Sequence, residues 1–315
     1  MAALMLPRGL IVELLTPLDA GGDVDLRGLA SQLERVQGYA QSVFLCGPRA
    51  GRGLALSGSR RADILEAAFS LADEEMTLMA WITGRSPEET AENLALMEAR
   101  TGKNGRRGSV VWVDTPLFYH SNRGLPSYYR DLCSSTGMPL ILVNDPGLAK
   151  ESGRALKRSH IRTAVLKELA HMEEVQGLIF TGPLERCRNY RKASRFRTVF
   201  RIYDGDEEQF LDHPSSHGVV SPGANLAPAA WREITAYSLN NGADGEGRSP
   251  RLRRIWDLGG YLHRLLLLYR SSPGPLIQAA LVETGVLGAA GPPGESPGPE
   301  VVSGLLSLMR ERGDA

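Results

Sequence analysis

The feature that most constrains the fold is an alternation of short apolar runs with amphipathic helical segments over about the first 240 residues. Strands that are covered by helices on both faces read as continuous apolar runs, so these runs predict buried parallel strands. The predicted strands are residues 10–15, 42–46, 76–82, 109–113, 140–143, 175–180, 198–203 and 218–221. Eight such pairs favour an α/β fold, a closed (β/α)8 TIM barrel, with an open doubly wound sheet as the alternative.

Two helices have explicit start signals. Asp25 is a predicted N-cap, and the segment from Ser86 to Glu89 combines a capping box with proline at the first helical position.

We expect residues 1–240 to form the barrel and 241–315 a small C-terminal helical region. That region contains predicted helices at 252–269, 276–284 and 301–312, a linker at 240–250 and a Gly/Pro-rich irregular stretch at 288–299. An exposed loop is expected at 103–108.

Composition excludes several classes of protein. Lys plus Arg is 36 and Asp plus Glu is 36, so the net charge of zero argues against a nucleic-acid partner. No apolar run approaches about 18 residues, and the first residues resemble no leader, so we expect no membrane partner and a cytoplasmic protein. The three cysteines, Cys46, Cys133 and Cys187, are too scattered for a disulfide framework or a zinc site. We expect no cofactor and no bound metal.

Function in such a barrel sits at the C-terminal ends of the strands. Five segments there, in chain order, resemble motifs of the dihydrodipicolinate synthase/N-acetylneuraminate lyase family. They are TPLDAGGDVD at 16–25, TPLFY at 115–119, NDPG at 144–147, DGD at 204–206 and SPGANLAP at 221–228. The resemblance runs from about residue 9 to 284. It implies a (β/α)8 barrel with a C-terminal helical region, class I aldolase chemistry and a homo-oligomer, either a dimer or a tetramer.

The resemblance also implies which positions carry the chemistry. A strand-six lysine forms a Schiff base with pyruvate or a related keto acid, and a strand-five tyrosine transfers the proton. Here those positions are Ile179 and Val143, and Leu148 replaces an arginine that some members carry after strand five. Isoleucine has no amine and valine cannot transfer a proton, so we expect no Schiff base.

The family's loop after strand two binds the keto-acid carboxylate through hydroxyls and backbone N–H groups. In this chain it reads GPRAGR at 47–52, without the paired hydroxyls. Arg49 and Arg52 could hold an anion instead, because arginine binds carboxylate or phosphate bidentately; the alternative is a surface or interface pair. Tyr119 could reach a neighbouring subunit's site, as a family tyrosine does, or pack at an interface.

Two acidic residues stand at positions that are usually apolar or small in the family. Glu13, if it points into the barrel, needs a partner or a raised pKa, and is either a functional candidate or the partner of a buried arginine. Asp145 could be a general base or could join Glu13 in a site for a hard metal such as Mg²⁺. The alternative for Asp145 is a hydrogen-bonded turn carboxylate before Pro146.

Three functions remain open from the sequence. The preferred one is a diverged homologue that binds a small anion, such as a keto acid or sugar acid, or has a structural or regulatory role. The second is a lyase that uses rebuilt carboxylate or metal chemistry through Glu13, Asp145 and Asp204. The third is a subunit that assembles with an active paralogue. The predicted ligand-binding residues are Thr16, Gly47, Arg49, Arg52, Asn144, Ser221, Gly223 and Asn225.

Overall fold

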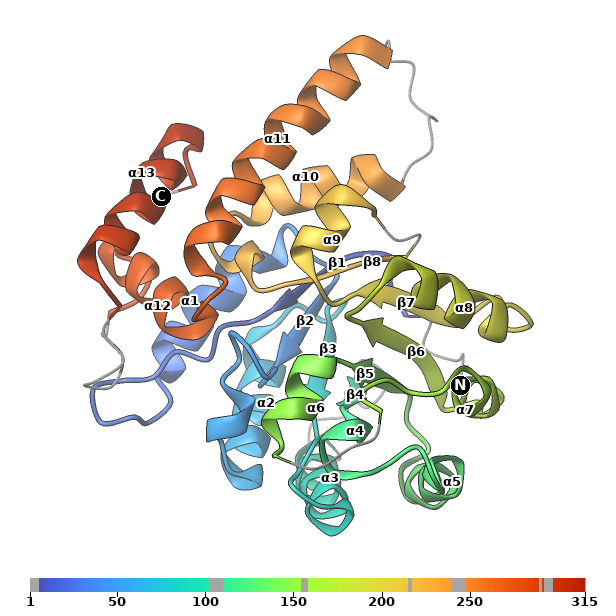
Figure 1. The fold of residues 1–315 in the computed structure, drawn as a ribbon. Helices are drawn as coiled ribbons and strands as arrows, with labels where there is room; N and C mark the ends of the chain where they lie inside the picture. The colour runs from blue at the N-terminus through green and yellow to red at the C-terminus, as the bar shows by residue number, and fades with distance from the viewer. Residues whose placement is uncertain are drawn as a thin grey trace.

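Eight parallel strands close into a barrel and follow one another around it in chain order (Figure 1). The computed structural model describes residues 6–101, 110–153, 158–214, 217–239, 248–288, 291 and 297–314. The strands are β1 Gly9–Glu13, β2 Ser42–Leu45, β3 Thr77–Trp81, β4 Val110–Asp114, β5 Leu140–Asn144, β6 Val175–Phe180, β7 Arg201–Asp204 and β8 Gly218–Ser221. The predicted (β/α)8 barrel is therefore confirmed.

The inside of the barrel is a packed apolar core to which every strand contributes. Because side chains alternate along a strand, every second residue points inward. The inward residues form one buried cluster that includes Ile11, Phe44, Met79, Trp81, Val111, Val113, Ile141, Val143, Ile179, Tyr203 and Val220. The outward residues of the same strands belong to a larger cluster beneath the helices. A polar side chain on the inward row can therefore reach water only at the ends of the barrel.

Ten helices in the described part of the barrel surround the strands. They are α1 Leu26–Gln37, α2 Gly58–Leu71, α3 Pro87–Thr101, α4 Pro116–Tyr119, α5 Leu125–Thr136, α6 Pro146–Glu151, α7 Thr163–Leu169, α8 Leu184–Ser194, α9 Glu207–Asp212 and α10 Pro228–Leu239. The carboxylate of Asp25 accepts the N–H of Arg27, and the hydroxyl of Ser86 accepts the N–H of Glu89, so both helix starts use the expected caps.

The structure differs from the sequence prediction mainly in three places. Strand β7 begins at Arg201 rather than 198, because Arg197 donates to the carbonyls of Ala170 and Val175 and holds a turn before the strand. The short helices α4 and α6 were not predicted. Each begins with a proline directly after a strand, and proline fits the first helical position because it lacks an N–H to satisfy.

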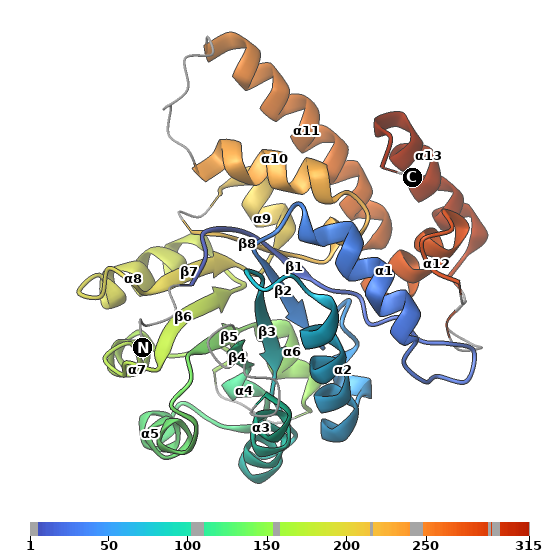
Figure 2. The same ribbon diagram turned by 180° about the vertical axis from the view of Figure 1, so that it is seen from behind.

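Three further helices pack on one side of the barrel (Figures 1 and 2): α11 Arg248–Tyr269, α12 Pro273–Glu283 and α13 Pro299–Arg312. Arg35 of α1 donates to the carbonyls of Asn225, Leu226 and Asp314, and so joins the strand-eight loop to the chain end. The C-terminal helices thereby cover the neighbourhood of β1 and β8 and bring α11 close to the C-terminal ends of those strands.

Several expected segments fall outside the described residues. These are the loop at 103–108, residues 240–247 of the expected linker, and most of 288–299. Residues 248–250 begin α11 and residue 299 begins α13, so neither belongs to irregular structure. The division at residue 240 stays a prediction.

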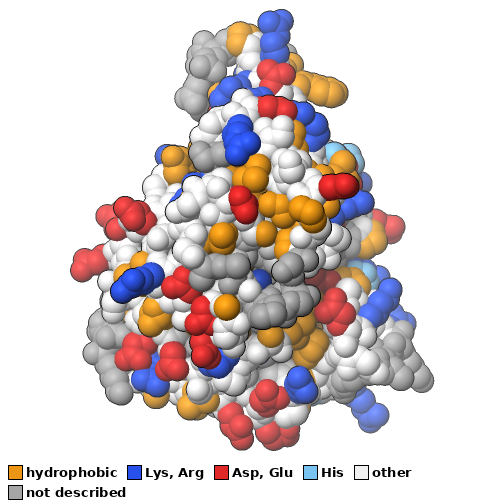
Figure 3. All heavy atoms as spheres, turned by 90° about the vertical axis from the view of Figure 1, so that its left-hand side faces the viewer, with side chains coloured by type: hydrophobic (Ala, Val, Ile, Leu, Met, Phe, Trp, Pro, Cys, Tyr) orange, Lys and Arg blue, Asp and Glu red, His pale blue; other side chains and the backbone are white. Residues whose placement is uncertain are grey.

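Within the described ranges, no helix is long and apolar enough to cross a membrane. On the side that carries α12 and α13, acidic, basic and hydrophobic side chains are interspersed (Figure 3).

Candidate functional site at the mouth of the barrel

The two positions that the resemblance assigns to a lysine and a tyrosine lie side by side inside the barrel. Val143 and Ile179 are register partners across β5 and β6, and only 5% and 4% of their surfaces are exposed. Both belong to the apolar interior cluster. The lysines among the described residues, Lys150, Lys167 and Lys192, are all exposed on helices. The described interior therefore offers apolar contacts and no amine to a carbonyl compound.

The loop after β2 is folded tightly on itself. Cys46 and Arg52 adopt positive φ values of 54° and 52°, which non-glycine residues rarely do. A Cβ at Gly51 would lie 2.2 Å from the backbone nitrogen of Gly47, and one at Gly53 would lie 2.1 Å from the carbonyl oxygen of Cys46. Glycine is required at both places. Such compact turns form concave nests of backbone N–H groups that bind an oxyanion.

The oxyanion in this nest is the side chain of Glu13. Its Oε1 accepts the N–H of Arg49 at 2.6 Å and lies 3.5 Å from the N–H of Gly51. Glu13 continues the inward row of β1 after Ile11 and is 3% exposed. A Cβ at Gly47 would lie 2.6 Å from Cγ of Glu13, so glycine makes room for the carboxyl. Burial raises the pKa of Glu13, and the Arg49 charge and the N–H bonds offset this only in part.

Arg49 links the nest to the opposite side of the mouth. Its Nη2 pairs with Oδ2 of Asp145 at 2.9 Å, and its Nη1 donates to the carbonyl of Gly205 at 2.6 Å. Burial would lower the pKa of Arg49, but the charges of Asp145 and Glu13 outweigh burial and raise it. Arg49 therefore contacts both acids, Asp145 through its guanidinium and Glu13 through its backbone N–H. Among the described residues, no group of three or more His, Cys, Asp or Glu is placed to hold a metal ion.

Glu207 at the start of α9 is a mouth residue that the sequence analysis missed. Its Oε1 accepts the N–H of Gly223 at 2.8 Å and the hydroxyl of Ser221, and its Oε2 accepts the hydroxyl of Tyr269 at 2.8 Å. Burial raises the pKa of Glu207 to about 7, although these donors and Arg49 lower it in part. Ser221 and Gly223, expected to bind a ligand, thus bind a side chain of their own protein. The sequence signal that could have identified Glu207 was an acidic residue directly after the DGD segment. No sequence signal pointed to Tyr269 on α11.

Asn225 and Thr16 hold the mouth loops in place. The Asn225 amide donates to the carbonyl of Glu13 at 2.8 Å and accepts the N–H of Leu15 at 3.0 Å. The Thr16 hydroxyl donates to the carbonyl of Gly51 at 2.9 Å. Both side chains are buried, at 0% and 2% exposed. Their bonds connect β1 to the strand-eight loop and to the nest.

The strand-five end is also bonded within the chain. The amide oxygen of Asn144 accepts the N–H of Ile161 at 2.8 Å, and its nitrogen lies 2.9 Å from Nδ1 of His160. Asp145 caps α6 by accepting the N–H groups of Gly147 and Leu148, which is the turn role that the sequence offered as its alternative. It has this role in addition to the pair with Arg49.

Arg52 faces the C-terminal helices. Its Nη2 donates to Oε1 of Gln278 on α12 at 3.0 Å, and the Gln278 amide donates to the carbonyl of Leu18 at 2.6 Å. Gln278 therefore joins the loop after β2, the loop after β1 and α12. Arg52 contributes to that junction.

Tyr119 and Asp204 point outward from the barrel. The Tyr119 hydroxyl donates to buried Asp114 at 2.6 Å, and Asp114 also accepts the hydroxyls of Tyr129 and Thr83. Burial raises the pKa of Asp114 despite these donors. Asp204 follows inward-facing Tyr203 on β7, so its side chain lies on the outer side of the sheet, and it lines a surface pocket with residues of α8. Glu13, Asp145 and Asp204 are not gathered into one acidic site.

A second buried arginine, Arg61 of α2, supports the mouth and was also missed from the sequence. Arg61 donates to the carbonyls of Gly53 and Thr83, each at 2.7 Å, and its guanidinium lies 4.7 Å from the centre of the Trp81 ring. Burial lowers the pKa of Arg61. These bonds fix the loop after β2 against the end of β3, and the sequence offered only an arginine within a helical pattern.

Comparisons with known proteins agree with the fold and with the family that the motifs resemble. Residues 6–254 match the model of the Dihydrodipicolinate synthetase family. The 4-hydroxy-tetrahydrodipicolinate synthase of Psychromonas ingrahamii is 24% identical over 287 residues, covering 90% of this chain and 89% of the relative. A monomeric dihydrodipicolinate synthase variant superimposes with a TM-score of 0.80 at 18% identity over 99% of both chains. Ruminococcus gnavus sialic acid aldolase superimposes with a TM-score of 0.78 at 14% identity, over 96% of this chain and 97% of its own. A family match over most of the length, together with this barrel, shows that the chain belongs to the dihydrodipicolinate synthetase family.

Proposed function

We propose that this protein is a family member that forms no Schiff base with pyruvate and acts as a structural or regulatory protein rather than as a lyase. The observation that carries the proposal is the position of Glu13. Its carboxyl sits on the backbone N–H groups of the loop that, by the resemblance, would receive the carboxylate of a keto acid. The mouth is occupied by the protein itself.

The apolar side of the mouth supports the same proposal. Imine formation needs a partly deprotonated amine held against the carbonyl, and general acid–base catalysis needs a group that carries a proton. Ile179 and Val143 supply neither, and both are buried in contact with the interior cluster. Groups that act as a unit in catalysis leave little activity when they are lost together.

The charges at the mouth disfavour a further anion. Arg49 faces the carboxyls of Asp145, Glu13 and Glu207, and its guanidinium already bonds Asp145 and the carbonyl of Gly205. A keto acid or sugar acid would have to displace Glu13 from the nest and compete with Asp145 for Arg49. For this reason the proposal favours a structural or regulatory role over anion binding at the mouth.

Reductive trapping tests the proposal directly. The full chain is incubated with pyruvate and borohydride and its intact mass is measured, with a lysine-bearing family member as the positive control. We expect no added mass on this chain and a single adduct on the control. A stoichiometric adduct that maps to one lysine would contradict the proposal and would identify a lyase with a relocated amine.

The state of assembly remains a prediction that rests on the resemblance. The apolar segment after β4 gives it little support, because Leu117 and Tyr119 are buried within their own chain and only Phe118 is partly exposed. Sedimentation at micromolar concentration should show a dimer or tetramer, or a complex when an intact paralogue is added. A monomer under both conditions would exclude the subunit role.

A further inference from the structure

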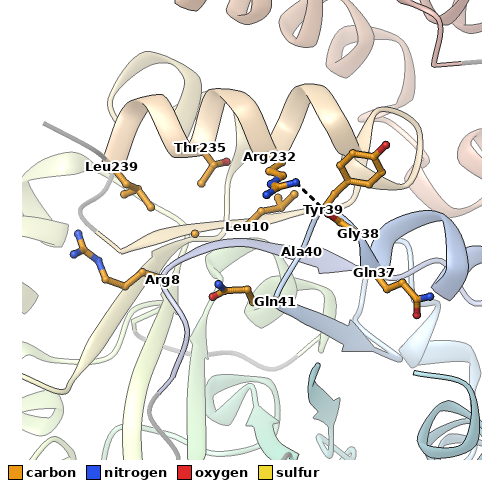
Figure 4. Close-up of a pocket in the computed structure, with 12 residues that line it drawn as sticks. Arg8, Leu10, Gln37, Gly38, Tyr39, Ala40, Gln41, Arg232, Thr235 and Leu239 are labelled. Carbon is orange, nitrogen blue, oxygen red and sulfur yellow. Dashed lines mark hydrogen bonds between the residues drawn. The ribbon is translucent and has the colours of Figure 1, made fainter. Parts of the chain in front are cut away.

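A second pocket lies at the base of the barrel, at the end of the strands opposite the mouth. It has a volume of about 490 Å³ and is formed by the start of β1, the turn between α1 and β2, and the second half of α10 (Figure 4). No role has been assigned above to any residue that lines it. Its size is within the range of pockets that bind small molecules.

Two arginines give the pocket a positive character. Arg8 and Arg232 both line it, and no Asp or Glu does so among the described residues. Figure 4 shows Arg8 near one end of the lining and Arg232 farther along, beside Tyr39, with Thr235 of α10 between the two arginines. Arg232 donates to the carbonyl of Gly38 at 3.1 Å, which fixes its side chain beside the pocket. Two separated guanidinium groups favour a ligand with two separated oxyanion groups.

Thr235 supplies the second, independent observation. It is only 1% exposed, lines the pocket and hangs from α10 toward β1, yet its hydroxyl oxygen has no hydrogen-bond partner within the described structure. A buried hydroxyl without a partner has lost its bonds to water and gained none from the protein, which destabilises the fold. The side-chain oxygen of Gln37, which also lines the pocket, is another buried atom without a partner in the described structure. The Thr235 hydroxyl can bond to a polar group of a molecule in the pocket.

We propose that this pocket binds a short dicarboxylate, with one carboxylate at Arg8, the other at Arg232, and a hydroxyl on the connecting carbons bonded to Thr235. The apolar side chains of Leu10 and Leu239 also line the pocket and suit the aliphatic part of such a molecule. A hydroxylated four-carbon dicarboxylate such as malate carries these three groups. The ligand would act at the end of the barrel opposite Glu13 and independently of it.

Calorimetric titration of the full chain in a chloride buffer tests this site with malate, succinate and propionate. We expect saturable one-to-one binding of malate, binding of succinate several-fold weaker, and no saturation by propionate. Arg8→Ala and Arg232→Ala should each weaken malate binding about tenfold, since a lost charged contact of about 1.4 kcal/mol corresponds to that factor. Arg130→Ala, at an exposed arginine of α5, is the matched control and should leave malate binding unchanged.

Thr235→Val separates the hydroxyl from the charges. The variant removes an unpartnered buried oxygen, so it should melt no lower than the wild type, and it should bind malate and succinate equally well. A crystal structure with malate should place the molecule between Arg8 and Arg232. The proposal fails if malate does not saturate the wild type by about 10 mM, an affinity weaker than roughly 3 kcal/mol. It also fails if Arg130→Ala weakens binding as much as Arg8→Ala, or if malate lies at Arg49.

Discussion

The two ends of the barrel treat their buried polar groups in opposite ways. At the mouth, Glu13, Asp145 and Glu207 are buried and each is bonded to N–H, hydroxyl or guanidinium groups of the same chain. At the base, the hydroxyl of Thr235 is just as buried and has no partner in the described structure. Burial of a polar group therefore does not mark a ligand site by itself; what marks it is whether the protein supplies the partner.

The mouth itself has two unlike halves. The half made by β5 and β6 is apolar, with Val143 and Ile179 paired across the sheet. The half made by β1, the loop after β2 and the strand-eight loop is charged, and its buried carboxyls are bonded within the chain. By the resemblance, family chemistry would need an amine in the first half and an open oxyanion nest in the second. Among the described residues the first half holds no amine, and Glu13 fills the nest. Three substitutions probe these halves.

The largest effect is expected when a charge is placed in the apolar half. Ile179→Lys should cost on the order of 4 kcal/mol at pH 7, because burial depresses the pKa of a lysine by several units. A group with a depressed basic pKa binds fewer protons in the folded state, so the loss should shrink as pH rises to 9. Urea unfolding at pH 7 and pH 9 measures the loss of unfolding free energy. The control is Ile179→Met, which should cost under about 1.5 kcal/mol.

The reactivity of the same variant with pyruvate depends on both halves of the mouth. Ile179→Lys should give a slow pyruvate adduct under borohydride but no aldolase turnover, because Val143 provides no proton and Glu13 still fills the nest. Full turnover from this single substitution would show that the charged half does not block substrate.

An intermediate effect is expected from removing the cation that joins the charged half. Arg49→Met removes the guanidinium that pairs with buried Asp145 and lowers the pKa of Glu13, although the backbone N–H on Glu13 remains. The variant should cost about 3 kcal/mol, toward the lower end for a broken buried pair because Arg49 is 31% exposed. The matched control is Arg60→Met, which removes an exposed pair with Asp23 and should cost under about 0.5 kcal/mol. Equal losses in the two variants would mean that the mouth network is no more than surface charge.

The smallest effect should appear as a pH dependence. The pKa of Glu207 is raised by burial to about 7 from an unfolded value of 4.5, so the folded state binds the extra proton and its contribution to stability is lost as pH rises from 4.5 through 7. Glu207→Gln should remove about 2 kcal/mol of that decline between pH 5 and pH 8.

Glu233→Gln is the control for this experiment. Its hydrogen bond to Arg254 lowers the pKa of Glu233, so the contribution of this carboxylate has the opposite dependence and is lost as pH falls. The account is contradicted if the stability of wild type and Glu207→Gln changes in parallel over this range.

The sequence predicts the parts of this protein that depend on near neighbours. Apolar runs located all eight strands, and alternation along β1 could place Glu13 on the same face as Ile11. Asp145 before Pro146 is a recognisable cap signal, and it does cap α6. These features follow from local periodicity and local hydrogen bonds.

The rest depends on contacts between distant parts of the chain. Tyr269 lies 62 residues from Glu207, and Gln278 lies 226 residues from Arg52, so no local pattern could pair them. The position of the Glu13 carboxyl depends on the tight turn with positive φ at Cys46 and Arg52, and the residue types do not predict that turn. For the same reason the sequence could not predict that the guanidinium of Arg49 is bonded to Asp145 and to the carbonyl of Gly205.

In the proposed function, Glu13 occupies the nest that would otherwise receive a keto-acid carboxylate. Calorimetric titration of pyruvate into wild type, Glu13→Gln and Glu13→Ala distinguishes an occupied nest from an open one. The glutamine keeps an oxygen on the N–H groups of Arg49 and Gly51, whereas alanine empties the nest. We predict no saturation of wild type or Glu13→Gln, and binding by Glu13→Ala with a Kd on the order of 1 mM, about 4 kcal/mol. Saturable pyruvate binding by the wild type, or none by Glu13→Ala, would contradict the account.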